Sequence, residues 1–196
     1  MNQRDRVSKL AKNDFDGAFK LARSITEVRE RVQSLGWVAR FAPAAEIPHV
    51  ISAASKSVSS STDYYACTMA LAWPLRALHE TGRDDLIPSM LKTAIELSVD
   101  VRPAASRAEA LVLLIHAVLP HGLQTANPAI AALKSTASDS HWRVVRALVD
   151  VALLVNGLDR QSAMDIASLI PVENKRASTM DRLSNGETMQ PRPFFW

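Results

Sequence analysis

The sequence predicts an all-α protein that folds as a right-handed superhelix, an α-α solenoid of about five antiparallel helix hairpins. Apolar residues recur three and four positions apart, as in the segment 71–78, and the alternating runs typical of strands are missing. Prolines also recur at a constant interval, because Pro48, Pro88 and Pro128 lie 40 positions apart. A period of 36 to 40 residues suits one helix hairpin per repeat.

Clusters of Gly, Pro, Ser, Asn and Asp divide the chain into about ten helices. We expect each of the three spaced prolines to open a helix, because a missing N–H costs nothing in the first turn. The hairpins are expected at about 14–42, 46–82, 85–122, 127–157 and 159–185. The end units act as caps, so residues 1–185 form a single helical-repeat domain.

Residues 186–196 form a tail rich in proline and aromatic residues, ending in MQPRPFFW. Pro191 and Pro193 forbid a helix here. A cluster of three aromatic residues is seldom left in water. We therefore expect Phe194, Phe195 and Trp196 to dock on this chain or, in a homo-oligomer, on a second copy.

Composition gives only general limits on function. The formal net charge is +3, from 23 basic and 20 acidic residues, which is too balanced to indicate nucleic-acid binding. The single cysteine, Cys67, cannot form an internal disulfide. The longest apolar run, residues 110–120, is interrupted by His116 and is too short to cross a bilayer. We expect a cytoplasmic protein that does not enter a membrane.

No catalytic or metal-binding constellation stands out. Asp139, Ser140 and His141 are consecutive, and neighbours in a turn point in different directions, so a helix N-cap explains them better than a triad. His116 and His121 are five positions apart and would not share a helix face. We expect no catalytic residue, no metal and no cofactor, and enzyme activity is the minor alternative.

Two further features concern helix packing. Arg31, Arg107 and Arg176 occupy corresponding places near the start of second helices, each with an apolar residue four positions later. Pro74 lies inside a helical pattern and should kink its helix, because it removes a backbone hydrogen bond and pushes on the preceding turn.

Two units resemble HEAT repeats, whose pattern is an early Pro, an Asp in the turn within the hairpin, and a Val-Arg pair near the start of the second helix. The residues that match are Pro88, Asp100 and Val101-Arg102 in one unit, and Pro128, Asp139 and Val145-Arg146 in the next. The resemblance implies a curved superhelix that most often binds proteins. It also implies buried pairing between repeats for Arg31, Arg107 and Arg176, which HEAT arginines often make with an Asp. A minority of such proteins bind nucleic acid, and a few are DNA glycosylases.

A row of polar and aromatic residues is the candidate binding site. Trp37 and Arg40 form a WxxR pattern that Trp73 and Arg76 repeat 36 positions later, and His116 lies another 40 positions on. In a solenoid such positions stack, so the row would present cations and aromatic faces along a groove to an acidic peptide. The competing explanation is that the cations interact with helix ends while the tryptophans fill the core.

These observations predict a protein-interaction module or scaffold that binds a partner protein or peptide through a concave groove. A nucleic-acid-binding HEAT-like protein is the first alternative, and a basic stripe on the concave face would favour it. A HEAT-like DNA glycosylase is the second, and it would need a carboxylate beside aromatic residues and cations.

Overall fold

The computed structural model describes residues 3–195, and every regular element in that range is a helix. In chain order the elements are α1 (Gln3–Leu10), α2 (Phe15–Ser24), α3 (Val28–Phe41), α4 (Ile47–Ser59), α5 (Tyr64–Ala70), α6 (Ala72–Glu80), η1 (Asp84–Leu86), α7 (Ile87–Ser98), α8 (Ala104–Val118), η2 (Leu119–His121), α9 (Leu123–Lys134), α10 (Trp142–Asn156), α11 (Arg160–Ser168) and α12 (Glu173–Ser184). The protein is therefore all-α over this range. Among these helices, none combines the length and the apolar character needed to cross a membrane.

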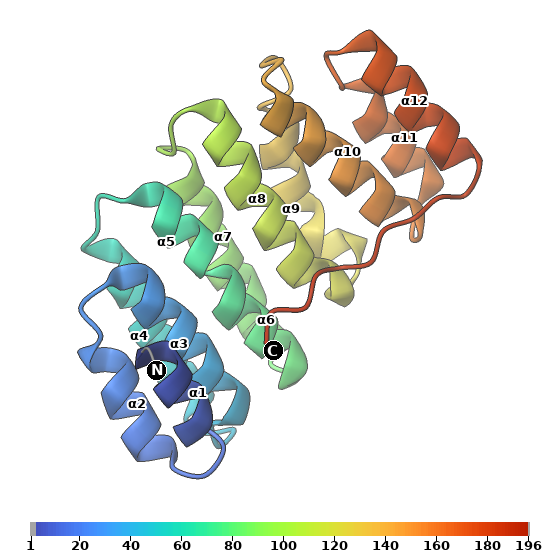
Figure 1. Ribbon diagram of the computed structural model, residues 1–196. Coiled ribbons are helices and arrows are strands. Elements are labelled where there is room, and N and C mark those ends of the chain that lie inside the picture. Colours follow the sequence, from blue (N-terminus) through green and yellow to red (C-terminus); the bar gives the residue numbers. More distant parts are fainter. Residues whose placement is uncertain (1–2, 196) are drawn as a thin grey trace.

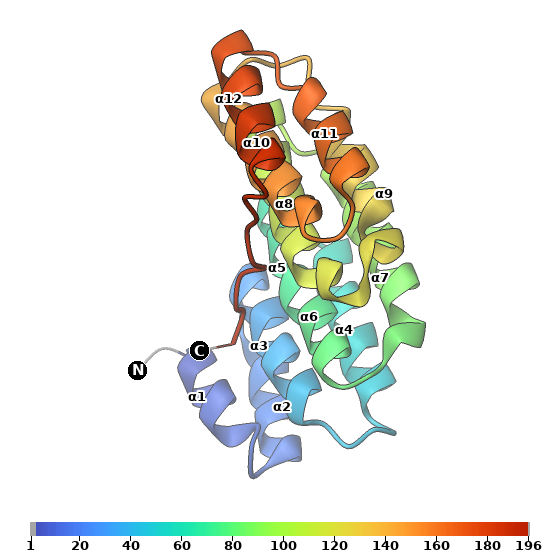
Figure 2. The ribbon, with the colours of Figure 1, turned by 90° about the vertical axis from the view of Figure 1, so that its right-hand side faces the viewer.

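The helices stack in chain order in two layers (Figures 1 and 2). One layer runs through α3, α5 with α6, α8 and α10, and the other runs through α4, α7, α9 and α11. Within the first layer α3 packs against α6, α6 against α8, and α8 against α10. The end helices differ, because α1 packs against α2 and α3, whereas α12 packs against α10 and α11. Contacts are thus mostly between near neighbours in the chain.

One hydrophobic core runs the length of this stack. It extends from Val7 in α1 to Leu183 in α12, and it includes Phe194 from the tail. Polar side chains define where several helices begin. Asp14 and Asp159 accept hydrogen bonds from the free backbone N–H groups of α2 and α11, as N-cap residues do.

The spaced prolines do not all open helices. Pro48 and Pro88 lie in the first turns of α4 and α7, as expected. The expectation is wrong for Pro128, which lies inside α9, because that helix begins at Leu123. The missing N–H of Pro128 leaves the carbonyl of Gln124 without its helical partner, and Gln124 lies on a groove at the protein surface. The predicted start of this helical unit, residue 127, is thus four residues too late.

The Val-Arg pair of the third unit also differs from its expected place. Val101 and Arg102 precede α8, which begins at Ala104, so they belong to the turn and not to the second helix. Val145 and Arg146 do lie in the first turns of α10.

Pro74 accompanies an interruption in its helix. The helix is interrupted at Leu71, between α5 and α6, three residues before the proline. The neighbouring helix α3 approaches closely here, because a Cβ added at Gly36 would lie 2.8 Å from Cβ of Trp73 and 3.0 Å from N of Pro74. A glycine at position 36 thus allows α3 and α6 to touch backbone to backbone.

Two of the three arginines at corresponding positions, Arg31 and Arg176, make a repeated contact. Arg31 Nη1 donates to the carbonyl of Ile25 at 2.8 Å, and Arg176 Nη1 donates to the carbonyl of Ile170 at 3.0 Å. In both cases the acceptor is a buried isoleucine six positions earlier. These carbonyls lie in the turn within a helix pair. Arg31 Nε also donates to the hydroxyl of Ser57 on α4, in the next predicted hairpin, at 3.1 Å, and Arg176 pairs with Glu173. The partners of these two arginines are thus carbonyls, a hydroxyl and a Glu carboxylate in place of the expected Asp.

Candidate functional site

The tail returns along the first helix layer after α12 ends (Figures 1 and 2). Asn156 on α10 donates from Nδ2 to the carbonyl of Glu187 at 2.9 Å, and the backbone N–H of Met189 donates to the carbonyl of Leu153 at 3.0 Å. Further along, the tail contacts α8, then α6, then α3. It therefore crosses the helices in the reverse of their chain order.

Among the described residues of the tail, Phe194 is the most buried, with 3% of its surface exposed. Its ring lies edge-on to Trp73 at a centroid distance of 5.3 Å and an interplanar angle of 85°. Trp73 Nε1 also donates to the carbonyl of Phe194 at 3.1 Å. One tryptophan thus binds both the side chain and the backbone of the same tail residue.

The next residue, Phe195, packs on α3. Its ring lies 4.9 Å from that of Trp37 at an angle of 69°. The guanidinium carbon of Arg40 is 4.9 Å from the Phe195 ring centroid, within the range of a cation–π interaction. Trp196 lies outside the described residues, so its docking stays a prediction.

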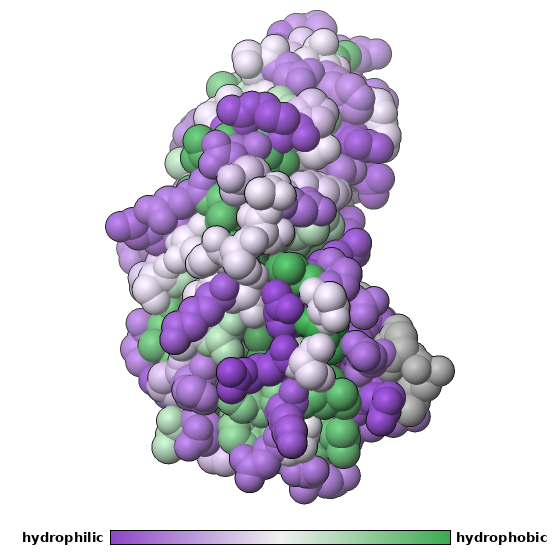
Figure 3. All heavy atoms as spheres, turned by 90° about the vertical axis from the view of Figure 1, so that its left-hand side faces the viewer, coloured by the Kyte–Doolittle hydropathy of each residue, from purple (hydrophilic) through white to green (hydrophobic). Residues whose placement is uncertain are grey.

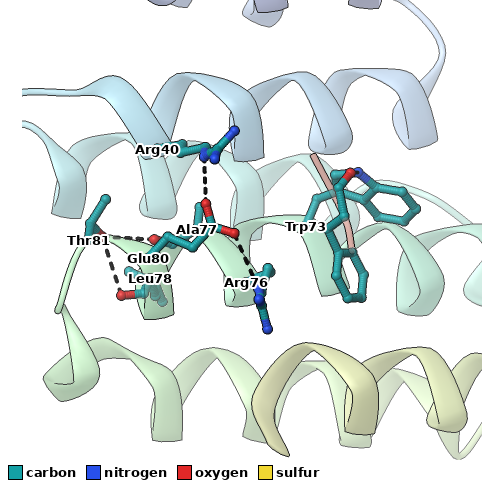
Figure 4. A network of polar contacts seen from close by, with 8 residues as sticks. Arg40, Trp73, Arg76, Ala77, Leu78, Glu80 and Thr81 are labelled. Carbon is teal, nitrogen blue, oxygen red and sulfur yellow. Dashed lines mark hydrogen bonds and ion pairs between the residues drawn. The ribbon is translucent and has the colours of Figure 1, made fainter. Parts of the chain in front are cut away.

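Glu80 on α6 joins the two arginines of the row (Figure 4). Its carboxylate pairs with Arg40 Nε at 2.5 Å and with Arg76 Nε at 3.3 Å. Both cations are thereby partly neutralised. This face presents less free positive charge to a ligand than the sequence suggested.

His116 on α8 is fully buried, and its Nδ1 accepts a hydrogen bond from the backbone N–H of Arg192 at 3.2 Å. Burial lowers the pKa of His116 to about 4, with a smaller effect from the charge of Arg192. The ring is therefore neutral at pH 7, and it acts as an acceptor for the tail backbone. The expectation that His116 presents a positive charge is therefore wrong.

The five residues of the predicted row lie together beside the tail, and we call them the tail-binding face: Trp37, Arg40, Trp73, Arg76 and His116. The sequence indicated their alignment but not Glu80, which pairs with both arginines, nor Gly36, which lets the helices approach. Glu80 follows Arg76 by four positions, and that spacing was the available signal.

A cavity of about 470 Å³ lies beside the middle of the tail. Tail residues 188–191 line it on one side, and Arg76 and apolar residues of the helix stack, among them Leu119 and Leu154, line it on the other. The tail is therefore closely packed at Phe194 but leaves open space near Gln190.

Arg192 borders a second cavity of about 280 Å³, between α5, α8 and α10, and several charged side chains line it. Tyr65 donates from its hydroxyl to Glu109 at 3.3 Å, and Asp150 pairs with Arg146 at 3.6 Å. Burial raises the pKa of Asp150, and the nearby arginines oppose the shift. The carboxylates here have partners within the chain.

Hydrophilic and hydrophobic residues are interspersed on the side of the molecule drawn in Figure 3.

Comparison with protein-family models, curated proteins and solved structures finds no match for this chain. The functional argument thus depends on the tail-binding face itself.

Proposed function

We propose that the protein is a HEAT-like helical-repeat module that binds a partner protein or peptide in an extended conformation through the tail-binding face. The observation that carries this proposal is that an extended segment, the tail, lies there and is held through both backbone and side chains. Trp73 and His116 bond to tail backbone groups, which any peptide offers. Such backbone contacts are typical of surfaces that recognise extended chains.

The repeat architecture is part of the same proposal: five hairpins forming a right-handed superhelix with the tail-binding face along its concave groove. Two features support it. The helices stack mainly on near neighbours, as solenoid repeats do. Arg31 and Arg176, at opposite ends of the stack, close their turns through the same contact.

The pairing of Glu80 favours a binding role over the glycosylase alternative. Glu80 lies beside aromatic residues and cations, as that alternative requires, but it pairs with both Arg40 and Arg76. The tail also covers the neighbouring tryptophans. A carboxylate held between two guanidinium groups is better suited to maintaining a surface than to attacking a substrate.

The test uses the full chain with Phe194→Ala and Phe195→Ala, which loosens the tail without removing it. Random peptides displayed on phage are selected on this protein and measured against Trp37→Ala and Trp142→Ala in the same background. Trp142 is the matched control, because it is an exposed tryptophan on α10 with 59% of its surface accessible. We expect selected peptides to lose at least about tenfold in affinity with Trp37→Ala and to be unaffected by Trp142→Ala, because buried aromatic anchors dominate interfaces. Selection of no peptide, together with tight binding of a DNA duplex, would favour the nucleic-acid alternative.

A further inference from the structure

We propose that the natural ligand of the tail-binding face is a segment of another protein with the chemistry of the tail, namely an extended peptide that contains prolines followed by two adjacent aromatic residues. The chain's own tail is then a competitor in cis, which must be displaced before the ligand binds. This inference rests on the proposed function and specifies the ligand.

The aromatic pair is the first element of recognition. Phe194 and Phe195 contact different helices, α6 through Trp73 and α3 through Trp37. Successive side chains of an extended chain point in opposite directions, so two adjacent aromatic rings fit two separate tryptophans on neighbouring helices. A single aromatic residue would fill only one of these positions.

The spacing of the backbone contacts is the second element. His116 accepts from the N–H of residue 192, and Trp73 donates to the carbonyl of residue 194. Pro191 and Pro193 flank residue 192 and have no N–H groups to leave unpaired. Prolines also hold the free peptide extended, which lowers the entropy cost of binding.

The charge of the face argues against an acidic ligand. Arg40 and Arg76 share Glu80, and His116 is neutral at pH 7. The remaining cationic contact is that of Arg40 with the Phe195 ring, which selects an aromatic side chain.

The cavity beside Gln190 shows how an external ligand could displace the tail. The tail leaves about 470 Å³ of space there, bordered in part by Leu158, whose surface is 57% exposed. A ligand with a leucine at the position of Gln190 would bury apolar surface that the tail leaves uncovered. Such a ligand would therefore bind the face more strongly than the tail segment does.

A second copy of the chain is a poorer candidate for the occupant. Exchange of identical tails creates no new contact, since each copy already fills its own face. A tethered segment acts at an effective concentration on the order of 1 mM, so the cis tail outcompetes the tail of a second copy in dilute solution. An external segment with better contacts is not limited in this way.

The experiment measures fluorescence anisotropy of a labelled peptide with the sequence of residues 187–196, ETMQPRPFFW. It is titrated with the wild-type chain, with Phe194→Ala/Phe195→Ala, and with Trp142→Ala as the control for an exposed aromatic residue outside the tail and its binding face. If the free peptide binds an open face at about 10 μM, cis competition weakens its binding to the wild-type chain by about 100-fold. We expect binding at about 10 μM only to the double variant, and binding about 100-fold weaker to both the wild-type and the Trp142→Ala chains.

Peptide variants test the chemistry. The peptide with Phe194→Ala should lose at least about tenfold in affinity for the double variant, whereas the peptide with Gln190→Leu should gain a few fold. Circular dichroism and melting confirm that the double variant is folded, and Phe195→Ala alone serves as a milder replacement if it is not.

Three results would overturn the proposal. Equal binding of the peptide to the wild-type and double-variant chains would show that the tail does not compete. Failure of the peptide to bind the double variant, while phage selection yields peptides of other chemistry that depend on Trp37, would refute this ligand class and leave the proposed function intact. A dimer that forms by tail exchange in the wild-type chain at micromolar concentration, seen by light scattering, would make a second copy the occupant.

Discussion

Trp73 and Phe194 are 121 residues apart in the chain and are joined twice, through a hydrogen bond of 3.1 Å and an edge-on ring contact of 5.3 Å. This pair attaches the end of the chain to the middle of the helix stack. It places an extended segment along the face on which Arg40, Arg76 and His116 are aligned.

Phe194→Ala should release the end of the tail. Loss of a buried ring and an aromatic pair costs about 3 to 5 kcal/mol in a rigid core. Here the tail can detach while the helices stay folded, so the fall in melting temperature should be only a few degrees. Hydrogen exchange should show the backbone N–H of Arg192 losing most of its protection, while amides in α8 keep theirs. Unchanged protection at Arg192 would mean that Phe194 does not hold the tail.

Glu80→Gln should destabilise the protein more than a change at an ordinary surface pair. The variant leaves Arg40 and Arg76, which are both partly buried, without their shared carboxylate. We expect a loss of about 1 to 2 kcal/mol in the free energy of unfolding, measured with urea. The matched control is Glu96→Gln, which breaks an exposed pair with Lys92 and should cost under about 0.5 kcal/mol. Equal losses in the two variants would contradict a special role for Glu80.

Acid should loosen the protein through His116. Its pKa falls from an ordinary value of about 6.5 to about 4 in the folded state. Between these values the unfolded chain binds more protons, so stability is complete above about pH 6.5 and is lost as the pH falls toward 4. The full cost is on the order of 3 kcal/mol.

The check compares the wild-type chain with His116→Gln in urea at pH 7 and at pH 4.5. Burial also lowers the pKa of His79 and of His121, so both proteins should weaken in acid. The wild-type chain should weaken more, and His49→Gln, which changes an exposed histidine, should follow the wild type. Parallel losses in wild type and His116→Gln would exclude His116 as the cause.

Gly36→Ala should force α3 and α6 apart. The added methyl group would lie 2.8 Å from Cβ of Trp73 and 2.9 Å from its backbone carbonyl carbon, and backbone cannot move away as a flexible side chain can. We expect a loss of about 1 to 3 kcal/mol, typical of overpacking. Gly157→Ala is the control, since its nearest contact of 3.6 Å is ordinary. Thermal melting of the two variants would decide, and equal melting temperatures would show that the helices tolerate the wider spacing.

The sequence by itself determined the class of structure and much of its layout. The three-and-four spacing of apolar residues reflects the helical period, and Asp, Pro and Gly at the breaks reflect local backbone chemistry, so helices and turns could be predicted from neighbouring residues. The recurrence of Trp37 with Arg40 and of Trp73 with Arg76 likewise predicted side chains on one face, because equivalent positions in stacked helix pairs share a direction.

Only the tertiary structure decided what that face contains. The predicted start of α9 was wrong because Pro128 lies inside the helix and does not open it. A proline inside a helix removes one backbone hydrogen bond, and the carbonyl left free can instead bond to solvent. The pairing of Glu80 with Arg40, the lowered pKa of His116 and the docking of Phe194 all depend on groups 40 to 121 positions apart. Such contacts arise when the helices stack and exclude water between them, and no local pattern of residues records which distant groups will then meet.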